Sequence, residues 1–122
     1  MALLNISNKN AGGVTVVNVS GRIVYGEEAN HLRREVRELF TSGSNKIVLN
    51  LAGVPYIDSG GIGALVGLYT SAHTMGAKLK LACANDKVTH VLEITRLIPI
   101  LGMFPNEELA VAAIKNSGTA CA

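Results

Sequence analysis

Apolar residues recur along the chain with two different periods, and these periods predict the order of its strands and helices. Residues 14–19 are rich in β-branched side chains, which favour a strand, and Gly12 and Gly13 before them predict a tight turn. Between residues 26 and 43 the apolar positions lie three or four residues apart, as on one face of a helix. The chain is therefore expected to open with a β-hairpin that leads into a helix.

Two short apolar runs in the middle of the chain predict strands that are covered on both faces. They span residues 47–51 and 79–83, and residues 59–75 between them have the composition of a helix. This order of strand, helix and strand predicts a parallel βαβ unit, in which residues 47–51 form a central strand.

The last third of the chain predicts a helix that begins after Asn85 and Asp86, a short strand over residues 100–104 and a helix over residues 105–114. We expect one domain over residues 1–116 and a disordered tail over residues 117–122. The predicted fold class is α/β. It is a small mixed sheet, with an antiparallel N-terminal hairpin followed by parallel strands, flanked by about four to five helices.

The composition excludes several classes of protein. Of the 122 residues, 48% are hydrophobic and 16% are charged, which is far from the composition of a disordered chain. Aromatic residues make up 4%, Trp is absent, and the 11 basic residues form no long basic stripe against the 9 acidic ones. A nucleic-acid partner is therefore not expected.

Targeting signals and chemically reactive clusters are also missing from the sequence. No apolar stretch is long enough to span a membrane, and the first residues lack the pattern of a signal peptide. Cys83 and Cys121 have neither metal-ligand nor disulfide spacing, and no catalytic triad spacing is present. We expect a cytoplasmic protein that is not an enzyme and has no catalytic residues, no metal and no cofactor.

One long segment carries almost no charge. From Ile47 to Ala77 the only formally charged residue among 31 is Asp58, where the chain's average predicts about five. The outer face of a solvated helix is normally charged. The predicted helix over residues 59–75 therefore either docks on a partner or is buried on both sides within the domain.

A helical projection of residues 59–75 separates large from small side chains. The projection places Ile62, Leu65, Val66 and Tyr69 on one face. Small or uncharged residues occupy the opposite face: Gly60, Ala64, Gly67, Ser71 and Met75. Of the two interpretations we favour docking, because small uncharged side chains let another backbone approach closely.

The turn from Asp58 to Gly63 lies where a buried strand gives way to a helix, a common place for ligand and regulatory sites. Three interpretations remain open. Asp58 or Ser59 caps the helix; Ser59 is a site of modification at the positive end of the helix; or the glycines cradle a phosphate. The segment lacks the Lys-Ser/Thr ending of a P-loop and the full glycine spacing of a dinucleotide fingerprint.

Residues 47–65, IVLNLAGVPYIDSGGIGAL, resemble the signature of the STAS domain, and in particular that of bacterial anti-sigma-factor antagonists. In that family a strand is followed by Asp-Ser-Ser-Gly-hydrophobic-Gly and a helix. The likeness extends over nearly the whole chain, from Val14 to Leu97. The resemblance implies a small sheet flanked by helices, in agreement with the pattern of apolar positions.

The resemblance also implies a regulatory cycle. Ser59 is similar to the serine that is phosphorylated by a partner that is both an anti-sigma factor and a kinase. Phosphorylation ends the binding of that partner, and a PP2C-type phosphatase restores it. The combined partner-binding surface that we predict is Val24, Tyr25, Asp58, Ser59, Gly60, Gly61, Gly63, Ala64, Gly67 and Ser71.

Two positions depart from the family pattern, and they keep alternatives open. Gly60 stands where the family usually has a second serine, and Val24 where many antagonists carry an acid that helps contact the kinase. The first alternative is a STAS binding subunit of a transport or stress-signalling complex that is not phosphorylated. The second is a small nucleotide-binding or nucleotide-hydrolysing enzyme that uses the Gly60–Gly63 turn.

Overall fold

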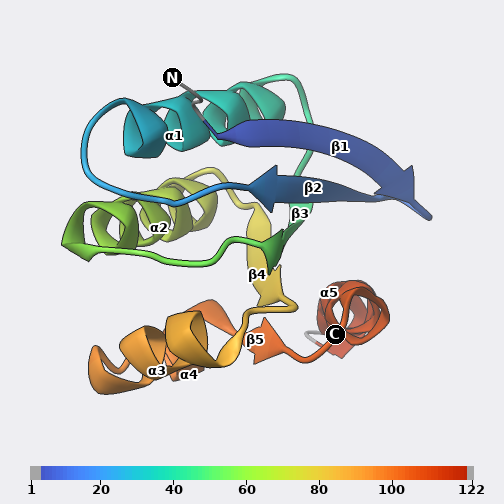
Figure 1. Ribbon diagram of the computed structural model, residues 1–122. Helices are drawn as coiled ribbons and strands as arrows, with labels where there is room; N and C mark the ends of the chain where they lie inside the picture. The colour runs from blue at the N-terminus through green and yellow to red at the C-terminus, as the bar shows by residue number, and fades with distance from the viewer. Residues whose placement is uncertain (1–3, 121–122) are drawn as a thin grey trace.

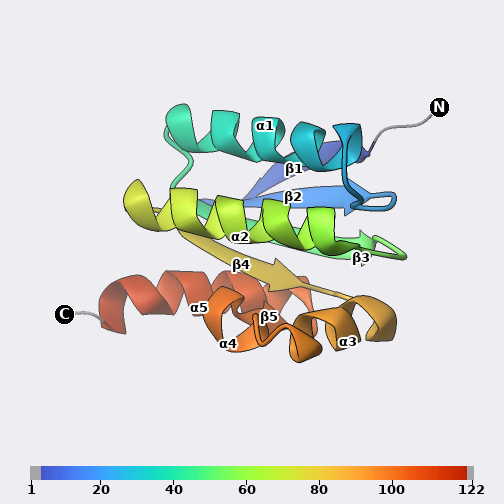
Figure 2. The ribbon, with the colours of Figure 1, turned by 90° about the vertical axis from the view of Figure 1, so that its left-hand side faces the viewer.

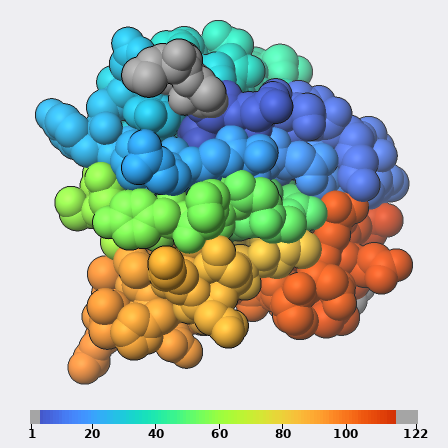
Figure 3. Space-filling model, in the orientation of Figure 1, coloured from blue at the N-terminus to red at the C-terminus, as the bar shows by residue number. Residues whose placement is uncertain are grey.

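The computed structural model of the protein describes residues 4–120, and their side chains as far as Lys115. Five strands form one sheet in the order of the chain (Figure 1). The strands are β1 (Asn5–Ala11), β2 (Val14–Ser20), β3 (Lys46–Gly53), β4 (Lys78–Ala82) and β5 (Met103–Phe104). β1 and β2 pair antiparallel, and every later pair is parallel, so the mixed sheet and the central position of β3 are confirmed. In the space-filling view the chain colours follow one another from the blue hairpin to the orange helices, as this strand order requires (Figure 3).

The helices occupy both faces of the sheet. They are α1 (Glu27–Thr41), α2 (Ser59–Thr74), α3 (Asp86–Ile94), α4 (Ile98–Leu101) and α5 (Glu107–Ala120). α1 and α2 lie side by side on one face, with α3 and α4 below them, and α5 lies behind the sheet (Figure 2). The outward side of α2 is therefore left uncovered by any other helix.

Each sheet face buries its own group of apolar side chains. On the side of α1 and α2, residues such as Val17, Leu49 and Leu65 are completely buried. On the side of α5, Val16 and Val48 pack with Ile114. Residues of β3 contribute to both groups, which explains why its sequence is a continuous apolar run.

The C-terminal third differs from its prediction in two places. Residues 98–101 form the single helical turn α4, so the predicted strand over residues 100–104 shrinks to Met103 and Phe104. Pro99 lies in the first turn of α4, where its missing N–H costs nothing. The last helix continues to Ala120 and does not end at Ile114. Of the tail expected to be disordered, residues 121–122 lie outside the described residues.

No helix within residues 4–120 is both long and apolar enough to cross a membrane.

Candidate functional site

The segment that joins β3 to α2 is held in place from two directions. Ile57 forms an isolated parallel bridge with Ile23, which follows β2 in the chain. From the other side, the side-chain amide of Asn85 donates a hydrogen bond to the carbonyl oxygen of Val54 at 3.1 Å. These contacts fix the position at which Asp58 and Ser59 start the helix.

Asp58 is the N-cap of α2 and also ties that helix to the loop between β2 and α1. Its Oδ1 accepts a hydrogen bond from the backbone N–H of Gly61 at 2.9 Å, which is the capping bond. The backbone N–H of Tyr25 donates to both carboxylate oxygens, at 3.0 Å and 3.1 Å. One carboxylate therefore joins two segments that are 33 residues apart in the chain.

The charged form of Asp58 is favoured in the folded protein. Desolvation acts to raise the pKa of this carboxyl group, but the backbone N–H groups of Gly61, Tyr25 and Gly60 together outweigh it. The pKa of Asp58 therefore lies below its ordinary value. A lowered folded-state pKa means that the carboxylate stabilises the fold above the unfolded-state pKa, and that this contribution is lost as the pH falls through the folded-state value.

We expect Asp58→Ala to lower the free energy of unfolding by about 1–2 kcal/mol at pH 7, because the capping bond and the tie to Tyr25 are both lost. The difference from the wild type should shrink as the pH falls below about 4 and through the lowered folded-state pKa, where the carboxylate of the folded protein becomes protonated. Urea unfolding followed by circular dichroism at several pH values measures both effects. Asp58→Asn is the control, since it keeps one acceptor oxygen without a charge; a wild-type pH dependence retained in this variant would contradict the assignment.

Ser59 is the first residue of α2, and its side chain is exposed. Within the described residues its hydroxyl makes no hydrogen bond, whereas the Gly61 N–H, a potential partner, is already used by Asp58. Ser59 therefore does not cap the helix. Its hydroxyl is free to react or to contact another molecule.

The two glycines that follow Ser59 bring α2 close to the loop between β2 and α1. A Cβ on Gly60 would lie 2.5 Å from the Cα of Tyr25, and a Cβ on Gly61 would lie 2.1 Å from the carbonyl oxygen of Ile23. Gly61 is buried, so its place in the predicted partner-binding surface is wrong. Because this turn is filled by the protein's own backbone and its Gly61 N–H is taken by Asp58, it offers no open loop to cradle the phosphates of a nucleotide.

The inward side of α2 is rotated relative to the prediction. Ala64 is completely buried, with Leu65 and Leu68, so it cannot contact a partner in this structure, whereas Val66, expected on the large apolar face, is 39% exposed. The physical reason is that small residues at Gly61 and Ala64 let the helix pack close to the sheet. The outer face of α2 consists of Ser59, Gly63, Val66, Thr70, His73 and Thr74.

The remaining predicted surface residues are accessible to different extents. Gly63 and Tyr25 are exposed, with Tyr25 at 82%. Val24, Gly67 and Ser71 are half-buried. The outer face of α2 itself carries no Asp, Glu, Lys or Arg, although its side chains differ from those predicted, and the guanidinium of Arg33 from α1 lies beside Gly63 at its edge.

A groove between the first turns of α1 and α2 was not predicted from the sequence. It has a volume of about 380 Å³. Its lining residues are Tyr25, Gly26, Ala29, Asn30, Arg33, Gly60 and Gly63. The polar residues between the apolar positions of residues 26–43 predict an exposed helix face. They do not predict the groove, because their position relative to α2 depends on how the two helices pack.

Comparison with known proteins identifies the family. Residues 5–110 match the family model of the STAS domain. The chain belongs to the STAS domain family. It is 25% identical over 113 residues to an anti-sigma F factor antagonist of Paenibacillus polymyxa, an alignment that covers 92% of this chain and 96% of the relative.

Two solved structures have the same fold. An anti-sigma factor antagonist from Mycobacterium paratuberculosis superimposes with a TM-score of 0.81 at 19% identity, covering 92% of this chain and 94% of the other. The Bacillus cell fate determinant SpoIIAA in its phosphorylated form gives a TM-score of 0.68 at 17% identity, covering 90% and 99%. At these identities the likeness establishes the STAS fold alone.

The close packing of the neighbouring loop explains why this STAS domain has a glycine at position 60. A serine there would place its Cβ against the backbone of Tyr25, so the loop between β2 and α1 would have to move. Gly60 therefore allows this loop to pack closely, and the STAS domain keeps Ser59 as the hydroxyl at the start of α2.

Proposed function

We propose that this STAS domain is an anti-sigma-factor antagonist that acts by binding a protein partner in the cytoplasm. The partner is an anti-sigma factor that is also a serine kinase, and the antagonist thereby controls transcription that depends on a sigma factor. Phosphorylation of Ser59 ends the binding, and a PP2C-type phosphatase restores it. The names of the relatives support the antagonist role, and the phosphorylated neighbour supports the modification.

The observation that carries the proposal is the environment of Ser59. Its exposed hydroxyl stands at the start of α2, next to a carboxylate that is fixed by backbone bonds, and at the edge of an uncharged helix face. A kinase can reach this hydroxyl without unfolding the domain. A partner can cover the uncharged face without removing water from a charged side chain of α2.

The effect of a phosphate follows from the same environment. A phosphoserine adds about −1.5 to −2 charge at neutral pH. The helix N–H groups cannot fully compensate this charge, because Asp58 already accepts the bond from Gly61. A partner that covers Ser59 would have to remove water from the phosphate, so the phosphorylated antagonist should be released.

Phosphate transfer tests the proposal directly. We expect a kinase-type anti-sigma factor from the same organism, with ATP, to add one phosphate to the wild-type chain and none to Ser59→Ala, as located by mass spectrometry. Thr70→Ala is the matched control, because Thr70 is an exposed hydroxyl residue on the outer face of the same helix. Phosphate on another residue, or equal labelling of Ser59→Ala, would refute the assignment.

A second candidate is a STAS binding subunit of a transport or stress-signalling complex that is never phosphorylated. The two departures from the family pattern, Gly60 and Val24, favour it. In that case the chain would take up no phosphate, and its complex would contain a transporter or scaffold component in place of a kinase. Capture from native extract followed by mass spectrometry distinguishes the two.

A further inference from the structure

The groove between α1 and α2 has a basic wall with no acid opposite it. Arg33 lines both this groove and a neighbouring hollow of about 460 Å³ along α1. Its Nη1 donates to Oδ1 of Asn30 at 3.3 Å. Within residues 4–115 the single ion pair joins Lys9 to Glu107, so no carboxylate neutralises Arg33 there.

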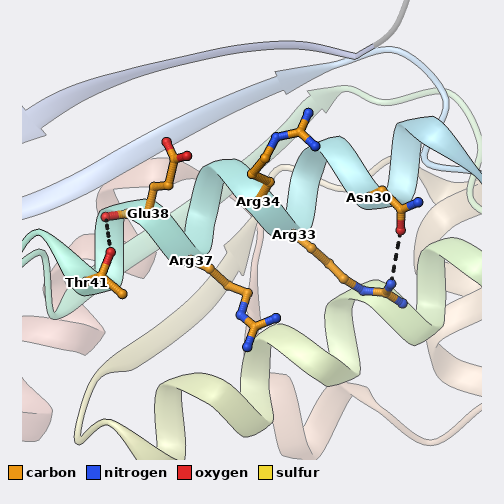
Figure 4. Close-up of a pocket in the computed structure, with 6 residues that line it drawn as sticks. All are labelled: Asn30, Arg33, Arg34, Arg37, Glu38 and Thr41. Carbon is orange, nitrogen blue, oxygen red and sulfur yellow. Dashed lines mark hydrogen bonds between the residues drawn. The ribbon is translucent and has the colours of Figure 1, made fainter.

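Arg33 reaches across to α2 (Figure 4). Its Nη2 lies 4.0 Å from the position of a Cβ on Gly63, and its Nε lies 3.9 Å from the position of a Cβ on Gly67. Arg34, the next residue, extends away from α2 in the same view. Of these two neighbouring arginines, the guanidinium of Arg33 is therefore the one that rests on α2.

Ser59 lies one helical turn before Gly63. Residues four apart on a helix have Cβ positions about 5–6 Å apart. No side chain stands at Gly63 to separate Ser59 from Arg33. A phosphate on Ser59 extends several bonds beyond the Cβ, so a rotamer directed along α2 brings it toward the guanidinium beside this glycine.

The other neighbours of Ser59 leave a phosphate in need of a positive partner. Asp58 is negative, and its Oδ1 occupies the Gly61 N–H at the start of α2. None of the residues that line the groove is acidic. Arginine is suited to this role, because its planar donors pair with two phosphate oxygens at once.

We propose that Arg33 holds the phosphate of phosphorylated Ser59 beside the groove between α1 and α2, where Gly60 and Gly63 form the α2 side of the groove. The inference rests on the proposed modification of Ser59 and adds the residue that binds its product. The position of the phosphate is then fixed against α1.

The test uses the chain with phosphoserine inserted at position 59 during translation, so that no kinase is needed. A nearby cation favours the dianionic phosphate and lowers its second pKa, which is ordinarily about 6. We expect Arg33→Gln to raise that pKa by roughly half a unit or more, measured by ³¹P NMR titration. Arg34→Gln removes the same charge from the adjacent position and should leave the pKa unchanged.

Equal pKa values in the wild type and Arg33→Gln, or an equal rise in both variants, would overturn the proposal. Thermal unfolding of the unphosphorylated variants checks that both arginine substitutions leave the fold intact. The titration does not depend on the proposed function. If no kinase for Ser59 exists, the proposed function fails, but the effect of Arg33 on the phosphate pKa is unchanged. If phosphate transfer succeeds and the titration shows no effect of Arg33, only the present inference fails.

Discussion

Gly61→Ala is expected to lower the free energy of unfolding by about 3 kcal/mol. The added methyl group would lie 2.1 Å from the carbonyl oxygen of Ile23 and 2.6 Å from Cγ1 of Ile57, and neither neighbour is the free end of a flexible side chain. The loop between β2 and α1 would have to separate from α2. Urea unfolding followed by circular dichroism measures the loss.

Gly63→Ala is the matched control for this substitution. Gly63 is exposed in the same helix, and the nearest atom to its added Cβ is 4.0 Å away, on Arg33. Alanine is favoured over glycine in a helix, so this variant should gain about 0.5–1 kcal/mol. A loss of similar size in both variants would mean that the close packing at Gly61 does not decide the outcome.

Phosphoserine at position 59 is expected to weaken binding of the anti-sigma factor by about 30- to 1000-fold. This corresponds to roughly 2–4 kcal/mol for desolvating the phosphate in a closed interface. Calorimetry with the unmodified and phosphorylated chains measures the ratio.

Lys115→Glu is the charge-matched control for the phosphate. It changes the net charge by about as much as a phosphate does, but Lys115 belongs to α5, behind the sheet and away from α2. We expect its affinity to stay close to that of the wild type. Equal weakening by both changes would show that total charge, and not the position of Ser59, controls binding.

Most elements of the fold could be predicted because each depends on a local pattern. The periodic apolar positions of α1 indicate that one face of this helix is buried, and the continuous apolar run of β3 indicates that both faces of this strand are buried. The segment Ile98–Leu101 could not be assigned in this way, because a short apolar run fits a strand or a buried helical turn equally well. Its conformation depends on how the chain returns to place β5 beside β4.

The position of the candidate site in the chain could be predicted, but the residues that form its exposed surface could be predicted only in part. Asp58 and Ser59 were found because a capping residue and a turn glycine have a recognisable order. The exchange of Ala64 and Val66 between inside and outside was not, since α2 is apolar nearly all round and its rotation is set by packing on the sheet. The hydrogen bond from the Tyr25 N–H to Asp58 joins segments that are distant in the chain, so no local sequence pattern predicts it.

The bond between Asp58 and the backbone of Tyr25 also bears on the entropy of association. Tyr25 is the most exposed large apolar residue among those described, yet its backbone N–H is held by both oxygens of Asp58. A loop that is already ordered loses little conformational freedom when a partner binds it, and a tyrosine side chain has few rotamers to lose. In the proposed complex we therefore expect Tyr25 to act as a preorganised anchor, whose docking carries a smaller entropic cost than that of an equally exposed residue on a mobile loop.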